Sequence, residues 1–180
     1  KDVIAQIKAK RFVPVSGTWA DVFNADDAKD APFQAHFLAA PATEETEQPY
    51  CECCAVGSLF LSCTLFANKM SNAEIDESGW LLGTKLHDKH KFGNGFHKVF
   101  SLPQLALIEV AFEGETTLLG TPCSLDATER RKAIAFETST AYARACLFRD
   151  KNSGPLGRND DQLLLAIMQN IVKNNGTFKP

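Results

Sequence analysis

The sequence predicts a mostly α-helical protein, a compact bundle of about five or six helices with a small β-hairpin near Lys91–Val99. Two observations lead to this prediction. Helix-capping signatures recur along the chain, and the apolar residues behind them are spaced as on one face of a helix. No internal repeat or linker divides the chain, so residues 1–180 are expected to form a single helical domain.

The helix starts are read from capping chemistry. A Ser, Asp or Asn side chain accepts a bond from a backbone N–H, and a Glu or Gln three residues later bonds back. Segments with this pattern begin at Ser71, Ser101, Asp126 and Asn159. A short opening helix starts near Val3 and is bounded by Pro14, and Asn174-Asn175-Gly176 predicts where the last helix ends.

The apolar stripes behind these caps predict the core. The longest candidate helix places Ile134, Thr138, Ala141 and Ala145 on one face. The stretch Cys54–Met70 is apolar nearly all round, which is typical of a helix at the centre of a bundle. The core residues expected around its Leu59–Leu65 portion are Leu105, Ile108, Phe112, Ile134, Leu164, Ile167 and Ile171.

Composition excludes some classes of function. The net charge of −3 argues against a globally basic nucleic-acid binder, because neutralising phosphates requires an excess of cations. No apolar run reaches the roughly 20 residues of a membrane-spanning helix, so no membrane association is expected. Three of the six cysteines crowd into residues 51–54, which favours reduced thiols and a cytoplasmic location over a disulfide framework.

The cysteine cluster is the first candidate site. Cys51 and Cys54 have the Cys-x-x-Cys spacing of zinc knuckles and redox motifs, and His87 with His90 would complete a tetrahedral zinc site. The competing interpretation needs no cofactor. It treats Cys54 and its neighbours Cys53 and Cys63 as small hydrophobic residues of a buried helix.

A basic segment, Lys85–Lys98, is the second candidate. Its cations surround Phe92 and Phe96, a mixture that can pair with phosphates and stack on bases. The candidate anion-binding residues are Lys85, His87, Lys89, His90, Lys91, His97 and Lys98. The alternative is a solvated hairpin or loop whose phenylalanines face the core.

A third segment, Asp150–Asp161, has the length of a calcium loop. Pro155 stands where such a loop needs glycine, so an ordinary interhelical loop is expected.

Three segments together resemble small proteins of bacteriophage and bacterial genomes. They are Cys51–Ser62, Phe100–Glu113 and Ile167–Pro180, and they cover roughly half of the chain. Those proteins carry a Cys-x-x-Cys-Ala-x-Gly pattern and have no assigned function. The resemblance therefore implies a phage or bacterial origin, and it implies no catalytic residue.

Common catalytic patterns are missing from the sequence, which has no Gly-x-Gly-x-x-Gly, phosphate loop, Gly-x-Ser-x-Gly or His-Glu-x-x-His. The favoured hypothesis is a non-enzymatic binding protein, of phage origin if the resemblance holds, that uses Lys85–Lys98 on an anionic ligand or a protein partner. The alternative is a metal-binding protein or enzyme built on Cys51, Cys54, His87 and His90.

Overall fold

A computed structural model describes most of the protein. The described residues are 1–23, 50–67, 99–115, 127–154 and 158–180. In this part of the chain 64% of residues are helical, in six helices, and a small three-stranded mixed sheet accompanies them. The prediction of a mostly helical fold is therefore confirmed.

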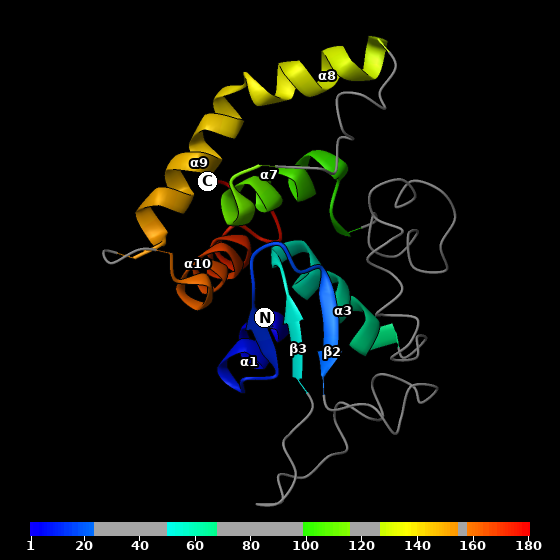
Figure 1. The fold of residues 1–180 in the computed structure, drawn as a ribbon, viewed down its shortest axis with the longest axis vertical. Helices are drawn as coiled ribbons and strands as arrows, with labels where there is room; N and C mark the ends of the chain where they lie inside the picture. Colours follow the sequence, from blue (N-terminus) through cyan, green and yellow to red (C-terminus); the bar gives the residue numbers. More distant parts are fainter. Residues whose placement is uncertain (24–49, 68–98, 116–126, 155–157) are drawn as a thin grey trace, which may run out of the picture. The chain divides into compact units, whose positions relative to one another are not determined.

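The structure groups the chain into two compact units, Lys1–Leu81 and Leu82–Pro180. The described sheet lies in the first unit and four of the helices lie in the second. Figure 1 shows the elements of each unit with their labels. That residues 1–180 form one domain stays a prediction.

The first unit contains the sheet, which the sequence did not predict. Its strands are β1 (Phe12–Pro14), β2 (Ala20–Phe23) and β3 (Tyr50–Cys53), in the order β1-β3-β2. The central strand β3 pairs parallel with β1 and antiparallel with β2. Pro14 is tolerated because β1 is an edge strand of this sheet. Strands of three or four residues are too short for an alternating pattern to stand out in the sequence.

Two helices pack with this sheet, α1 (Asp2–Lys8) and α3 (Ala55–Ala67), and Figure 1 shows α3 beside β2 and β3. Every residue from 54 to 62 is buried, as the all-round apolar sequence predicts. The two buried serines are satisfied by hydrogen bonds. Ser58 Oγ donates to the carbonyl of Ala55 over 2.8 Å, and Ser62 Oγ donates to Asp2 Oδ2 over 2.8 Å.

In the second unit, α7 (Leu102–Glu113), α9 (Thr140–Asn152) and α10 (Asp160–Lys173) pack against one another. Ser101 and Asn159 are confirmed as helix starts, but the predicted side-chain cap is present only at Asn159, because the Ser101 side chain makes no capping hydrogen bond. The Asn159 side chain accepts from the Gln162 N–H over 2.9 Å. The predicted stop is also confirmed, because Asn174 follows the last residue of α10 and both Asn175 and Gly176 have positive φ. The caps expected at Ser71 and Asp126 lie outside the described residues.

One capping partner differs from the prediction. Gln104 was expected to bond back to the start of α7, but its Oε1 accepts the backbone N–H of Phe178 over 2.7 Å. The Gln104 side-chain oxygen, which was expected to cap α7, is thus bonded to the backbone of the C-terminal segment. The same Phe178 is 1% exposed and packs edge-to-face on Phe148, with ring centroids 5.2 Å apart. Phe178 is therefore held in the core of this unit.

The predicted long helix through Ile134–Ala145 is wrong. It is divided into α8 (Ala127–Glu137) and α9, because Ser139 adopts an extended backbone and its side chain accepts from the Tyr142 N–H over 3.1 Å. Ile134 is 53% exposed, so its assignment to the core is also wrong. Leu105, Ile108, Phe112, Leu164, Ile167 and Ile171 are buried as predicted.

The arrangement of these core residues around α3 stays a prediction, because α3 belongs to the other unit. The hairpin expected at Lys91–Val99 lies outside the described residues except for Val99. The segment between α9 and α10 is an interhelical connection, as expected. Among the described helices, none has the length and apolar character needed to cross a membrane.

The contrast between Ile167 and Ile134 makes a matched test of the core. Ile167→Ala should lower the free energy of unfolding by about 2–5 kcal/mol, because it leaves a cavity among fully buried side chains. Ile134→Ala should change it by less than about 0.5 kcal/mol, because that side chain is already half in water. Urea denaturation of the two variants measures both values, and equal losses would contradict the assigned faces.

Candidate functional site

The cysteine cluster occupies the junction of β3 and α3. Cys51 and Cys53 are both buried residues of β3, and Cys54 stands immediately before α3. The Cys54 Sγ accepts the backbone N–H of Gly57 over 3.3 Å. The thiol thereby satisfies one of the N–H groups that a helix start leaves without an intrahelical partner. Cys54 therefore has a structural role in starting α3.

The glycine of the Cys-x-x-Cys-Ala-x-Gly pattern also has a structural explanation. A Cβ atom built on Gly57 would lie 1.8 Å from the backbone oxygen of Trp19. The backbone N–H of Cys54 donates to the neighbouring carbonyl of Thr18 over 2.6 Å. The chain entering β2 thus passes directly against the first turn of α3, and a residue with no side chain is needed where they meet.

Burial also reduces the reactivity of this cluster. Burial raises the pKa of the Cys53 thiol well above its ordinary value, and the neighbouring Cys51, Cys54 and Glu52 raise it further. Because the thiolate is the nucleophile and the metal ligand, a raised pKa makes both chemistries harder. Burial and the Asp2 carboxylate likewise raise the pKa of Cys63. This residue is only partly buried, so its expected place among the buried cysteines is wrong.

The predicted zinc site is only partly within the described residues. Cys51 and Cys54 are described, whereas His87 and His90 are not. Within the described residues no group of three or more His, Cys, Asp or Glu side chains is arranged to hold a metal ion. The set of Cys51, Cys54, His87 and His90 stays a prediction, and so do the anion-binding residues of Lys85–Lys98, which are outside the described ranges.

Thiol labelling tests this account of the cysteines. None of the five described cysteines is in a disulfide. A maleimide should modify Cys63 and Cys146 first, and Cys51, Cys53 and Cys54 only slowly until denaturant is added, because the latter three are buried. Peptide mapping reads each labelled site, and rapid labelling of Cys53 in the native protein would contradict the assignment.

The raised pKa of Cys53 also affects stability in alkali. As the pH rises through the ordinary thiol range, Cys53 ionises in the unfolded chain before it does in the folded chain. This residue therefore makes the folded protein less stable in alkali.

Helix α8 is a further candidate site, which the sequence did not predict. Only Ala133 of α8 is buried. Helical spacing puts Glu129 and Glu137 on the side of Ala133, four residues away in each direction. The consecutive cations Arg130, Arg131 and Lys132 are all exposed. No ion pair holds any of these three cations within the described part of the chain.

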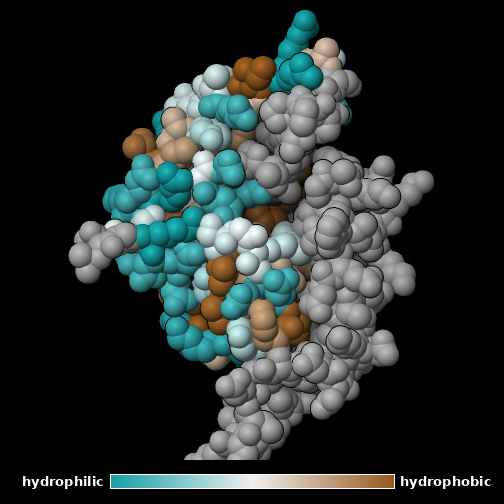
Figure 2. Space-filling view, in the orientation of Figure 1, coloured by the Kyte–Doolittle hydropathy of each residue, from teal (hydrophilic) through white to brown (hydrophobic). Residues whose placement is uncertain are grey.

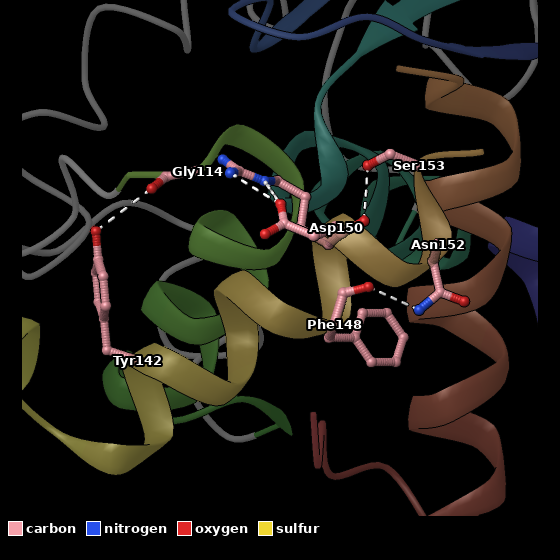
Figure 3. A network of polar contacts seen from close by, with 7 residues as sticks. Gly114, Tyr142, Phe148, Asp150, Asn152 and Ser153 are labelled. Atoms are coloured by element: carbon pink, nitrogen blue, oxygen red, sulfur yellow. Dashed lines mark hydrogen bonds and ion pairs between the residues drawn. The ribbon is translucent and has the colours of Figure 1, made fainter. Parts of the chain in front are cut away.

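The adjoining helix α9 is held to α7 by its inner face (Figure 3). Tyr142 Oη donates to the carbonyl of Gly114, the residue that ends α7, over 3.3 Å. The Arg149 guanidinium lies against Gly114 so closely that a Cβ there would be 1.8 Å from Nη1. This places a cation at the carbonyl end of α7, where the helix dipole favours positive charge. Ala145 is the buried residue of α9 between these two contacts.

Because the inner face of α9 is occupied, its opposite face points to solvent. Arg144, Leu147 and Lys151 follow one another at three- and four-residue spacing on that exposed face. Leu147 is 67% exposed. Figure 2 shows hydrophobic residues standing among hydrophilic ones over this part of the surface. Residues 127–152 contain six basic and three acidic residues, in a chain whose net charge is −3, so this region is locally positive.

A sequence signal for this region existed. Three consecutive hydroxyl residues, Thr138, Ser139 and Thr140, favour a helix cap over a continuous helix. With a helix boundary there, Ile134 and the basic run before it need not face the core.

No protein-family model matches the chain, and no match was found among curated proteins or solved structures.

Proposed function

We propose that this protein is a non-enzymatic binding protein that engages an anionic partner through two groups of basic residues, those exposed on helix α8 and those that the sequence places in the segment Lys85–Lys98. The observation that supports it is the state of Arg130, Arg131 and Lys132. Each is exposed, and no acidic side chain of the described part neutralises any of them. Exposed cations that have no ion-pair partner in the described part of the chain can pair there with an external anion.

The charge distribution supports the same proposal. A local positive field on a protein of net charge −3 orients an anionic partner, while the overall negative charge limits unspecific attraction. The sequence places a second concentration of cations in Lys85–Lys98, with histidines that gain charge as the pH falls toward 6. Binding should therefore weaken with salt and strengthen in mild acid.

The test compares charge reversals of equal size. Arg130→Glu, Arg131→Glu and Lys132→Glu are combined in one variant. The matched control combines Lys8→Glu, Lys173→Glu and Lys179→Glu, which changes the net charge equally at exposed positions elsewhere. Lys89→Glu with Lys91→Glu tests the basic segment. The probes are heparin, duplex DNA, nucleotides and an oligoglutamate peptide, each at low and at physiological salt.

Wild type should bind at least one probe in a salt-sensitive manner, and the α8 variant should bind it about tenfold more weakly than the control variant does. Circular dichroism of each variant confirms that the fold is intact. If wild type binds no anion, or if the α8 and Lys89/Lys91 variants both bind as well as the control, the proposal is wrong.

A further inference from the structure

The exposed surface of α8 and α9 contains apolar side chains as well as cations. Each helix also exposes one large aliphatic side chain, Ile134 on α8 and Leu147 on α9. On α8, Ile134 follows Arg130 by four residues and Arg131 by three, so it adjoins both. On α9, Leu147 follows Arg144 by three residues and precedes Lys151 by four. Both aliphatic residues are thus flanked by cations that have no ion-pair partner in the described part of the chain.

This repeated arrangement distinguishes between classes of anionic partner. A nucleic-acid backbone is bound by cations, with aromatic side chains for the bases, and neither aliphatic residue contributes to that. A helix lying in a membrane surface needs a continuous apolar face, whereas these helices present single aliphatic residues between charges. Protein interfaces combine an apolar centre with a polar, charged rim. Charge complementarity then requires the opposing rim to be acidic.

We propose that the outward faces of α8 and α9 form a docking surface for an acidic partner protein, in which Ile134 and Leu147 enter apolar pockets and the flanking cations pair with carboxylates. This inference rests on the proposed function and makes its partner more specific. The bond from Tyr142 to Gly114 and the burial of Ala145 hold the inner face of α9 in place before binding, so little order has to be gained in that helix when the partner docks.

The test uses two synthetic peptides of equal negative charge. One is a helical peptide with Leu at every third or fourth position and Glu between them, and the other has Ser in place of each Leu. Wild type should bind the leucine peptide about tenfold more tightly than the serine peptide. The variant with Ile134→Ser and Leu147→Ser should lose this preference and keep its binding to the serine peptide. Val172→Ser, at another exposed aliphatic residue of the same unit, is the control and should keep the preference.

Two further probes separate this inference from the proposed function. They are duplex DNA and vesicles containing phosphatidylserine. If wild type shows no preference for the leucine peptide, or binds DNA or the vesicles more tightly than that peptide, the docking of an acidic protein is wrong while anion binding stands. If wild type binds none of the four probes, the proposed function is wrong as well. Thermal unfolding of the variant with Ile134→Ser and Leu147→Ser should match wild type, because both aliphatic side chains are exposed.

Discussion

Replacing Gly57 by alanine should destabilise the protein strongly, although alanine is the better helix former. Inside a helix such a change normally adds about 1 kcal/mol of stability. Here the new Cβ would lie 1.8 Å from the carbonyl oxygen of Trp19. That oxygen belongs to the backbone next to β2, so relieving the clash requires the strand and α3 to separate. The expected loss is about 3 kcal/mol, the upper end of the usual cost of overpacking.

The control for this variant is Gly17→Ala. Gly17 has a φ of 79°, and nothing lies within 4 Å of an added Cβ. Its substitution should therefore cost only the left-handed backbone strain, about 1–2 kcal/mol. Chemical denaturation monitored by circular dichroism compares the two. A Gly57→Ala protein more stable than wild type would show that helix propensity prevails and that the close approach to Trp19 is wrong.

Truncating Phe178 to alanine should also have a large effect, although the residue is third from the end of the chain described. Its ring is 1% exposed and packs on Phe148, and its backbone N–H donates to Gln104. Removing a buried phenylalanine side chain typically costs about 3–5 kcal/mol. The melting temperature should fall accordingly, measured by differential scanning calorimetry.

Lys179→Ala is the matched control for Phe178→Ala. The Lys179 side chain is exposed, and the residue is held through its backbone, whose N–H donates to Asn170 Oδ1 over 2.9 Å and whose carbonyl accepts from Asn170 Nδ2 over 2.8 Å. Both bonds survive the substitution, so the free energy of unfolding should change by less than about 0.5 kcal/mol. Equal melting temperatures for the two variants would mean that the C-terminal residues do not contribute to the core.

The parts of this protein that sequence alone determined depend on local chemistry. The start of α10 follows from the local bond between Asn159 and the Gln162 N–H, and the start of α7 from the extended backbone of Ser101 with Pro103 in the first turn. The stop at Asn174–Gly176 follows from residues that accept a positive φ. The burial of α3 follows from a stretch so uniformly apolar that any packing must cover it. Such features do not depend on which distant segments are nearby.

The tertiary structure decided everything that depends on a distant partner. The Gln104 side chain accepts a hydrogen bond from the distant Phe178 and not from its own helix start. Gly57 is needed because the carbonyl of Trp19 passes directly against it. Ile134 belongs to an apolar pattern that suits a core, yet it is exposed because Ser139 ends α8 and only Ala133 of that helix is covered. A periodic pattern shows which side chains share a face, but only the packing of other elements decides which face is buried. The exposed basic surface of α8 and α9, on which the proposed binding rests, exists for that reason.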